Sequence, residues 1–305
     1  MASSTRLRLG TRGSALACAQ AAVVARDLES RHPGVHVELV LVKTTGDRLQ
    51  QGSLASVGGK GLFVKELEEG LLAGHVDLAV HSLKDVPAVV PDGLVIAAIP
   101  ERADPRDVLV SKEEGLDALP AGARLGTASV RRRAQLLARR RDLDVVVLRG
   151  NVDTRLRRWR EGDFTAIVLA AAGLARLGVE EPNARPLSTD VLLPAIGQGA
   201  LALECRADDA ATRALLAALE HVASARAVAA ERAFLLAIGG DCNTPIAAHA
   251  TIDGPHLALR AKVSDLEGIQ CLDDAIDGPI ADAEGLGRQL AERLLARGAA
   301  AVIGR

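Results

Sequence analysis

The feature that most constrains this chain is the repeated alternation of short apolar runs with longer amphipathic stretches. Residues 7–9 and 35–42 are short apolar or alternating runs, and an amphipathic stretch at 14–28 separates them. Short runs of this kind predict strands and the longer stretch predicts a helix. The rhythm continues with a helix near 62–72 and strands at 76–80, 94–99 and 107–110. This order is typical of βαβ units, so we expect an open α/β lobe.

A second set with the same rhythm begins near residue 124. It predicts helices at 130–138 and 152–160 and strands at 145–148 and 166–169. A segment rich in Pro, Gly and Ser at 187–198 then leads to a strand at 200–204 and two Ala-rich helices, as expected for a crossing back between lobes. Strands at 246–252 and 256–263 and a helix at 281–296 favour a small α+β domain.

The predicted fold class is therefore α/β, with two lobes and a small α+β C-terminal domain. We place domain 1 at residues 1–102 and 199–220, domain 2 at residues 103–198, and domain 3 at residues 221–305. The length of 305 residues accommodates two domains, or three if one is small.

Composition and charge exclude several classes of protein. Three Phe, one Trp and no Tyr cannot build an RNA platform of stacked aromatic rings. The 37 basic and 39 acidic side chains nearly cancel, which argues against a surface that tracks nucleic acid. No apolar run reaches 18 residues, and the first ten residues lack the apolar stretch of a secretory signal. We expect a soluble, cytoplasmic monomer that binds neither nucleic acid nor membranes.

The four cysteines show no CxxC spacing, which disfavours both a zinc site and a disulfide framework. Cys242 lies in IGGDCNTPI, among glycines and a proline, and is predicted on a loop after a helix. A thiol in such a place is a candidate nucleophile or attachment point. An ordinary loop cysteine is the alternative, and Cys18, Cys205 and Cys271 are expected to be buried spectators.

Polar residues follow the predicted strand at 76–80 in the sequence AVHSLKDVP. His81, Ser82, Lys84 and Asp85 stand where the strand runs out, at the edge where open α/β sheets bind ligands. A carboxylate there can exchange a proton with a leaving amine or stabilise a developing cation. The alternative is that Lys84 and Asp85 are solvated turn residues and His81 has an ordinary partner at the strand end.

Arginines stand where three predicted strands turn into helices. These are Arg12, the run Arg131, Arg132 and Arg133, and Arg149 with Arg155. Thr127 or Ser129 could cap the helix that the run opens, which would leave backbone N–H groups for an anion. Because a guanidinium pairs bidentately with a carboxylate, the set indicates a site for several carboxylates. For Arg132 or Arg133 alone, a solvated helix face is the alternative, and it becomes weaker for the set.

The polar, Gly-rich segment at 44–61 has no periodicity, and its length predicts either a mobile lid or an ordinary surface loop.

Six motifs in order resemble the hydroxymethylbilane synthase (porphobilinogen deaminase) family. They are TRGSALA at 11–17, VGGKGLFVKELE at 57–68, AVHSLKDVP at 79–87, DPRDVLVS at 104–111, LRGNVDTRL at 148–156 and LPAIGQGAL at 193–201. Together with a loop cysteine at 242, they span almost the whole chain. Each string alone is weak, but their order and spacing are specific.

The resemblance implies two lobes similar to type II periplasmic binding proteins, with an active site in the cleft between them, and a third domain. It implies the deamination and head-to-tail joining of four porphobilinogen molecules, followed by hydrolytic release of the linear tetrapyrrole. It also implies a dipyrromethane cofactor, held as a thioether on Cys242, and a catalytic role for Asp85. No metal is expected.

The same resemblance assigns binding roles to further residues. The implied binders of acetate and propionate groups are Arg12, Ser14, Ser82, Lys84, Thr127, Ser129, Arg131, Arg132, Arg149, Arg155 and Arg176. Phe63 would pack over the cleft, Gln198 would lie at the interdomain crossing, and Gly58, Gly59 and Lys60 would belong to the lid.

Three positions depart from the pattern of the family. Ala128 stands where a second Ser is frequent, Arg133 where Gln or another polar residue is common, and Asp241 where Gly usually precedes the cysteine. A carboxylate at Asp241 would oppose thiolate formation at Cys242 by repulsion, which predicts slower cofactor assembly.

A protein of another class could share such a fold. Two α/β lobes also describe solute receptors and effector domains that bind anions without changing them, and fold alone does not decide. Asp85 and Cys242 favour the enzyme, because a receptor needs neither. A nucleic-acid reading of the Arg131 to Arg133 run has no second support.

Overall fold

The computed structural model describes residues 5–44, 64–240 and 244–304. Their contacts divide the chain into two compact units. The first comprises Met1–Arg102 and Ala200–Ala225, and the second comprises Ala103–Gly199 and Arg226–Arg305.

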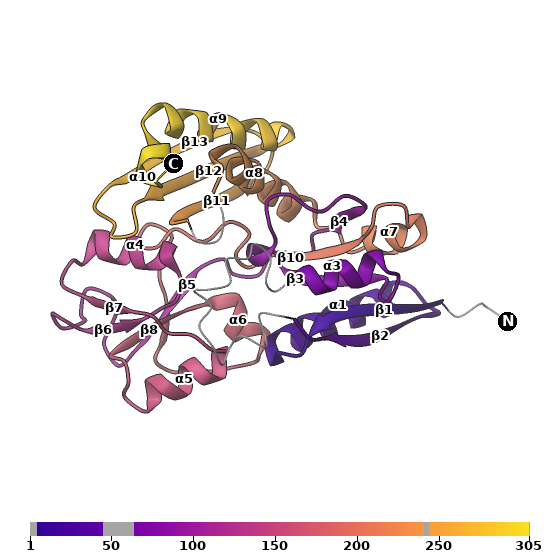
Figure 1. Cartoon of the computed structure of the whole chain (residues 1–305), viewed down its shortest axis with the longest axis horizontal. Helices are drawn as coiled ribbons and strands as arrows, with labels where there is room; N and C mark the ends of the chain where they lie inside the picture. Colours follow the sequence, from indigo (N-terminus) through magenta and orange to yellow (C-terminus); the bar gives the residue numbers. More distant parts are fainter. Residues whose placement is uncertain (1–4, 45–63, 241–243, 305) are drawn as a thin grey trace. The chain divides into compact units, whose positions relative to one another are not determined.

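The first unit is built on a five-stranded sheet of order β2-β1-β3-β10-β4 (Figure 1). Its strands are β1 (Thr5–Arg12), β2 (Val35–Val42), β3 (Leu78–Ser82), β4 (Leu94–Ala98) and β10 (Leu201–Arg206). β1 runs parallel to β2 and β3, whereas β10 runs antiparallel to β3 and β4. Its helical elements are α1 (Ala15–Arg31), α3 (Lys65–Leu72), α7 (Ala210–Ala217) and the short turn η3 (Leu83–Asp85).

Apolar side chains on both faces of this sheet form separate cores. Leu28 of α1 and Leu216 of α7 pack with Leu9, Leu78 and Leu203 on one face. On the opposite face, α3 packs through Leu67 and Leu71. The inner strand β3 is covered on both sides and begins with a continuous apolar run, whereas β1 and β2 also contain polar residues.

The second unit contains a five-stranded sheet of order β7-β6-β8-β5-β9. Its strands are β5 (Asp107–Ser111), β6 (Arg124–Gly126), β7 (Asp144–Val146), β8 (Ala166–Ala170) and β9 (Ala184–Pro186). β6 runs parallel to β7 and β8, and β5 runs antiparallel to β8 and β9. Helix α4 (Val130–Arg139) packs on one face, and α5 (Val152–Arg160) with α6 (Ala171–Arg176) packs on the other.

The remainder of the second unit is the expected small α+β part. An antiparallel meander of β11 (Ile246–Asp253), β12 (His256–Ser264) and β13 (Cys271–Pro279) is followed by η4 (Ile280–Asp282), α9 (Ala283–Ala296) and α10 (Ala299–Val302). Phe234 of α8 (Val222–Ile238) packs with Leu259 and Leu290 in its core. The α/β fold class is confirmed. The three-domain division stays a prediction, because the contacts join this part and the second lobe in one unit.

Two groups of contacts hold this α+β part against the second lobe. Arg133 of α4 forms an ion pair with Glu267 of the β12–β13 hairpin at 2.6 Å, and Arg141 donates to the Gly268 carbonyl at 2.6 Å. The buried Glu231 of α8 accepts hydrogen bonds from the backbone N–H groups of Gly197 at 2.7 Å and of Ala250 at 2.8 Å. The segment before Gln198 is thereby fixed to β11.

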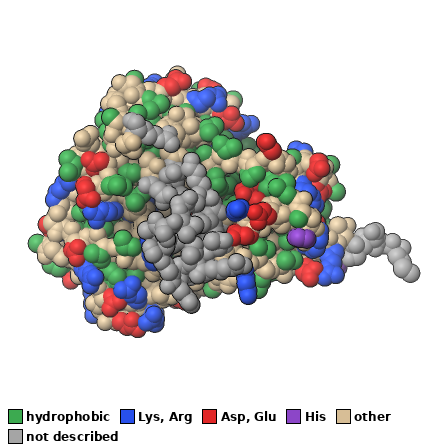
Figure 2. Space-filling model, in the orientation of Figure 1, with side chains coloured by type: hydrophobic (Ala, Val, Ile, Leu, Met, Phe, Trp, Pro, Cys, Tyr) green, Lys and Arg blue, Asp and Glu red, His purple; other side chains and the backbone are tan. Residues whose placement is uncertain are grey.

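Strand β13 was missed in the sequence, and the structure shows why. Few of its side chains are buried, and Asp273, Asp274 and Asp277 interrupt the apolar pattern of this edge strand. Cys271, expected to be buried, is exposed at its start, so that expectation was wrong. Among the described residues, no helix is long and apolar enough to cross a membrane. Charged side chains of both signs are interspersed on the face that Figure 2 shows.

Candidate functional site

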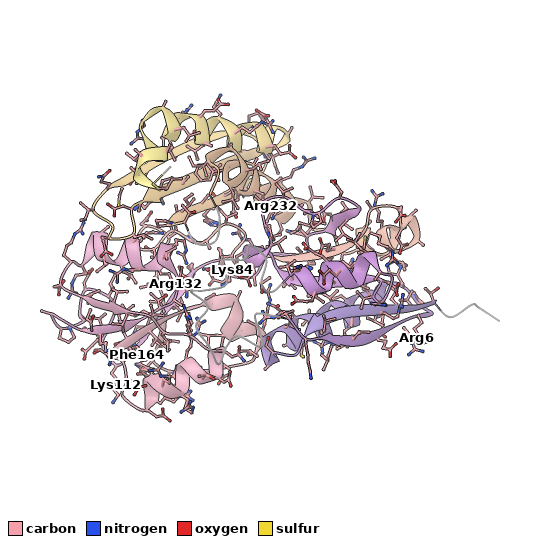
Figure 3. The ribbon with its side chains drawn as sticks, viewed as in Figure 1. Arg6, Lys84, Lys112, Arg132, Phe164 and Arg232 are labelled. Carbon is pink, nitrogen blue, oxygen red and sulfur yellow. The ribbon has the colours of Figure 1, made fainter. Side chains whose placement is uncertain are left out.

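The predicted site residues of the first unit meet at one edge of its sheet. β1 and β3 are parallel neighbours, paired at Gly10 and Ala79, so their carboxyl ends lie side by side. Arg12 ends β1, and Ser82 ends β3. Lys84 and Asp85 follow at once in the η3 turn, where Lys84 is labelled in Figure 3.

Local hydrogen bonds fix this edge. The Ser14 hydroxyl accepts from the Ala17 N–H at 3.3 Å and caps α1, while Gln20 of α1 donates to the Ser82 hydroxyl at 3.0 Å. Leu83 and Val86 are buried on either side of Asp85 in the chain, so they anchor the turn. Asp85 itself is exposed. The turn therefore presents this carboxylate to solvent from a rigid base.

Below this edge, the first unit buries a histidine–carboxylate pair that the sequence did not reveal. His81 Nε2 lies 2.9 Å from Glu204 Oε2, and the two side chains are 3% and 0% exposed. The alternative interpretation of His81, as a residue with a partner at the strand end, is therefore the one the structure supports. Burial raises the pKa of the nearby Glu68 carboxyl, and repulsion from Glu204 adds to the rise while His81 opposes it.

The second unit presents its predicted residues at the corresponding edge. Thr127 follows β6, Arg149 comes shortly after β7, and α6 with Arg176 follows β8, three strands whose carboxyl ends share one direction. Ser129 caps α4 as expected, since its hydroxyl accepts from the Arg132 N–H at 3.4 Å. The Thr127 hydroxyl accepts from the Ser129 N–H at 3.2 Å.

The basic run at the start of α4 is not one patch. Arg131 and Arg132 are each only 5% exposed and surround Asp107, the fully buried first residue of β5. Arg132 forms an ion pair with Asp107 Oδ1 at 2.7 Å, and Arg131 with Oδ2 at 2.8 Å. Arg133 points elsewhere, to Glu267. The alternative of a solvated helix face is therefore wrong for Arg131 and Arg132.

The charges in this cluster shift each other's ionisation. Burial alone would raise the pKa of Asp107, but Arg131, Arg132 and the Gln198 hydrogen bond outweigh it and hold the pKa below its usual value. Burial lowers the pKa of Arg131, and Asp107 works against that change. Gln198 belongs to the same cluster, because its amide donates to Asp107 Oδ1 at 2.9 Å and to the Pro105 carbonyl at 2.7 Å.

The other predicted arginines lie in less enclosed places. Arg155 donates through Nε to the Gly150 carbonyl at 2.6 Å, and Arg149 is exposed. Arg176 donates to the Gly199 carbonyl at 2.6 Å, and burial lowers its pKa to about 10. Within the second unit, the structure thus gathers a buried arginine pair and a more open group of arginines around the same set of strand ends.

Several predicted residues lie outside the described residues. These are Phe63, Gly58, Gly59, Lys60, Asp241 and Cys242. Among the described cysteines, Cys205 is fully buried and its burial raises the pKa of its thiol to about 11, which fits the expected spectator.

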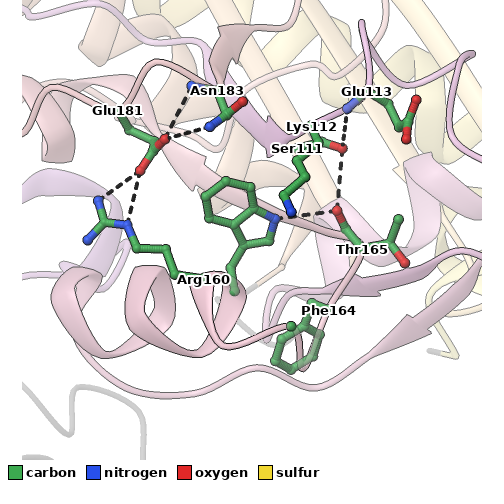
Figure 4. A pocket seen from close by; sticks show the side chains of 10 residues that line it. Ser111, Lys112, Glu113, Arg160, Phe164, Thr165, Glu181 and Asn183 are labelled. Atoms are coloured by element: carbon green, nitrogen blue, oxygen red, sulfur yellow. Dashed lines mark hydrogen bonds and ion pairs between the residues drawn. The ribbon is translucent and has the colours of Figure 1, made fainter.

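A pocket of about 410 Å³ in the second unit is separate from these residues (Figure 4). Ser111, Lys112, Trp159, Arg160, Phe164, Glu181 and Asn183 are among its lining residues. Much of its polar lining is already paired, since Glu181 accepts from both Arg160 and Asn183. None of the predicted site residues lines it.

Asp107 and Glu204 are the two carboxylates that sequence reasoning missed. Their partners are 25 and 123 residues away along the chain, so only the strand order brings them together. The usable signal was an acidic residue next to, or inside, an otherwise apolar strand.

Two α/β lobes with polar carboxyl edges, the first bearing Arg12, Lys84 and Asp85 and the second bearing several arginines, define a two-lobed protein equipped for anionic ligands. Residues 7–214 match the family described as porphobilinogen deaminase, dipyromethane cofactor binding domain, and residues 225–296 match the porphobilinogen deaminase C-terminal domain.

Curated relatives agree. A porphobilinogen deaminase of Syntrophotalea carbinolica is 54% identical over 97% of this chain and 95% of its own length. One of Trichlorobacter lovleyi is 52% identical over 98% of this chain and 96% of its own. Among solved structures, the methionine binding protein MetQ aligns with 13% identity over 70% of this chain and 89% of its own, at a TM-score of 0.44.

The chain belongs to the porphobilinogen deaminase family. It is a transferase of tetrapyrrole biosynthesis with a dipyrromethane cofactor, as the sequence motifs predicted.

Proposed function

We propose that this chain is a hydroxymethylbilane synthase in which Asp85 carries the acid–base chemistry and the arginines of the second unit hold the carboxylates of the pyrroles. Four porphobilinogen molecules are deaminated and joined head to tail, and water then releases the linear tetrapyrrole. The observation that carries the proposal is the buried Arg131–Asp107–Arg132 cluster at the strand ends of a chain that matches the family over most of its length.

Asp85 suits the deamination step. The step needs a proton for the leaving amine and a negative charge near the cation that forms when the amine departs. An exposed carboxylate on a short turn, anchored by buried Leu83 and Val86, can supply both without moving its backbone. Lys84 and Ser82, on the same turn, are proposed to hold carboxylates of the pyrrole, together with Arg12 and Ser14.

The second unit suits an anion with several carboxylates. Each porphobilinogen brings an acetate and a propionate, so each condensation adds about two negative charges at neutral pH. Arg131 and Arg132 outnumber Asp107 by one charge, and Arg149, Arg155 and Arg176 lie near neighbouring strand ends. Thr127 and Ser129 are proposed to add hydroxyl groups, and Gln198 to keep the cluster aligned.

The residues of this unit also fit the cofactor. Arg131 Nε is buried and has no hydrogen-bond partner among the described residues, as expected if a ligand's carboxylate completes its shell. When bound, the dipyrromethane supplies the pyrrole carbon to which the first porphobilinogen is joined. We propose Cys242 as its attachment point, Phe63 as a residue packing over the ligand, and Gly58, Gly59 and Lys60 as part of a lid. We also propose the three-domain division and a cytoplasmic monomer.

The test is the intact mass of the purified chain. It should exceed the sequence mass by two linked pyrroles, and Cys242→Ser should lack both this adduct and activity. Cys18→Ser and Cys205→Ser are the matched controls and should keep both. An adduct mapped to another cysteine would remove Cys242 from the proposal.

A further inference from the structure

Asp107 is the most completely enclosed carboxylate of the second unit's site. It is 0% exposed, and both of its oxygens face cationic or amide donors. Oδ1 accepts from Arg132 Nε at 3.0 Å, from Arg132 Nη2 at 2.7 Å and from Gln198 Nε2 at 2.9 Å. Oδ2 forms an ion pair with Arg131 Nη2 at 2.8 Å. Both oxygens are therefore enclosed by cationic or amide groups, although Oδ2 makes an ion pair and no hydrogen bond among the described residues.

The two arginines around Asp107 are not equivalent. Each nitrogen of the Arg132 guanidinium donates a hydrogen bond. Nε and Nη2 donate to Asp107 Oδ1, and Nη1 donates to the Val168 carbonyl at 2.9 Å. Arg131 donates through Nη1 to the Leu193 carbonyl at 2.6 Å and pairs with Asp107 through Nη2, while its buried Nε has no hydrogen-bond partner within the described residues. Arg131 is therefore the member of the pair with a guanidinium nitrogen that has no partner among the described residues.

Charge counting gives the same result. Two guanidinium groups and one carboxylate leave one positive charge in a buried place. An uncompensated buried charge is costly, so the cluster favours one further anion. Without the charge of Asp107 the excess would be two, and without Arg132 it would be zero.

We propose that Asp107 is a positioning residue. It neutralises Arg132 and orients Arg131, so that the cluster binds one carboxylate of the bound pyrrole through Arg131. This inference rests on the proposed function. Arg132 then acts through Asp107 rather than on the ligand, and the number of charges in the cluster sets the number of carboxylates that it holds.

The test compares two variants that differ only in Asp107. Arg132→Met keeps much of the side-chain volume and reduces the net charge of the cluster to zero. It should raise the KM for porphobilinogen about tenfold or more, because the cluster then has no net positive charge left for a carboxylate; tenfold corresponds to about 1.4 kcal/mol of binding free energy. Asp107→Asn/Arg132→Met restores one net positive charge. It should recover most of that loss, although it removes one more charged group.

A matched control comes from the next residue of α4. Arg133 pairs with Glu267 outside the cluster. Asp107→Asn/Arg133→Met leaves two positive charges in the cluster, as Asp107→Asn does. Its KM should therefore equal that of Asp107→Asn, because the Arg133 change does not alter the charge of the cluster. A purely structural role for Asp107 predicts instead that both double variants are at least as impaired as the single variants, and that result would overturn the proposal. If Asp107→Asn alone does not fold, the comparison of Arg132→Met with its double variant still decides.

A second readout separates the two sources of the carboxylate. If the ligand carboxylate belongs to the cofactor, the fraction of chains with the mass adduct should fall in Arg132→Met and recover in Asp107→Asn/Arg132→Met, in line with the net charge of the cluster. If it belongs to the incoming porphobilinogen, only KM should follow that order. An order unrelated to charge in both readouts contradicts the inference. Failure of the proposed function would show differently, as a parent chain with neither adduct nor turnover.

Discussion

The two five-stranded sheets share one strand order, β2-β1-β3-β10-β4 and β7-β6-β8-β5-β9, yet the charged residues at their carboxyl edges differ in type and in burial. The first leaves Asp85 exposed beyond β3, whereas the second buries Arg131 and Arg132 beyond β6. Part of this difference comes from the antiparallel strand of each sheet, β10 in the first unit and β5 in the second. Its carboxylate lies inside the strand in the first unit, as Glu204 of β10, and at the strand's start in the second, as Asp107 of β5.

A half-buried carboxyl of the first unit and a fully buried one of the second respond in opposite ways to the loss of water. Burial raises the pKa of Glu68, and the nearby Glu204 strengthens the effect. Burial acts in the same direction on Asp107, but two guanidinium groups reverse it. One lobe therefore contains a carboxyl whose pKa is raised, and the other a carboxyl whose pKa is lowered. The same strand order thus supports either a raised or a lowered carboxyl pKa, depending on which charges lie nearby.

The largest expected effect concerns the exposed carboxylate. Asp85→Asn keeps size and hydrogen bonding but removes the charge, so turnover should fall about a hundredfold or more, the low end for a general acid or base. Because Asp85 is exposed, the variant should unfold at the parent's temperature. Measuring turnover and thermal unfolding together checks both statements.

Asp92→Asn, at another exposed aspartate of the first unit, is the control and should keep near-normal turnover. Near-normal turnover in Asp85→Asn would take Asp85 out of the mechanism. The contrast between an exposed working carboxylate and a buried positioning one would then disappear.

An intermediate effect is expected from the arginines, because each condensation adds about two negative charges to a chain that stays bound. If arginines at different strand ends serve different stages, replacing each by Leu should stall the enzyme at a particular stage. The variants are Arg12→Leu, Arg131→Leu, Arg132→Leu, Arg149→Leu and Arg155→Leu. Complexes with one, two or three added units can be separated by anion exchange or by intact mass under limiting substrate.

The structure sharpens this prediction. The buried Arg131 should matter at a fixed stage, because its position is set by Asp107 and the Leu193 carbonyl. The exposed Arg149 should matter less and more evenly, because solvent and salt screen its charge. If all five variants give the parent's distribution with only a raised KM, the arginines provide general attraction and do not divide the task.

The sequence predicted both lobes, and the positions of the polar residues at their carboxyl edges, for one physical reason. Strands covered on both faces need continuous apolar runs, and polar residues just after such runs must lie at the carboxyl edge, as Asp85 and Arg149 do. Asp107 and Glu204 could not be found in this way. Their meaning depends on an antiparallel strand that joins the sheet from a distant part of the sequence, and spacing along the chain does not record that pairing.

The smallest expected effect concerns the raised pKa of Glu68. The folded state favours the protonated carboxyl, so at pH 7 the ionised Glu68 reduces the stability of the first unit. Glu68→Gln is neutral and close in shape, and should raise the unfolding temperature slightly at pH 7. The gain should be present above the raised folded pKa and should vanish as the pH falls through it toward the ordinary value of 4.5, below which Glu68 is protonated in both states. The neighbouring Glu69 is the comparison, because it is exposed, lies 3.7 Å from Lys65 and is the smallest of the causes that raise the Glu68 pKa, so Glu69→Gln should give a smaller gain than Glu68→Gln at pH 7. Thermal unfolding of both variants from pH 4 to pH 8 measures the difference. An equal or lower unfolding temperature for Glu68→Gln at pH 7 would mean that neither burial nor repulsion from Glu204 disfavours the ionised Glu68, and the opposite response of the two lobes would rest on Asp107 alone.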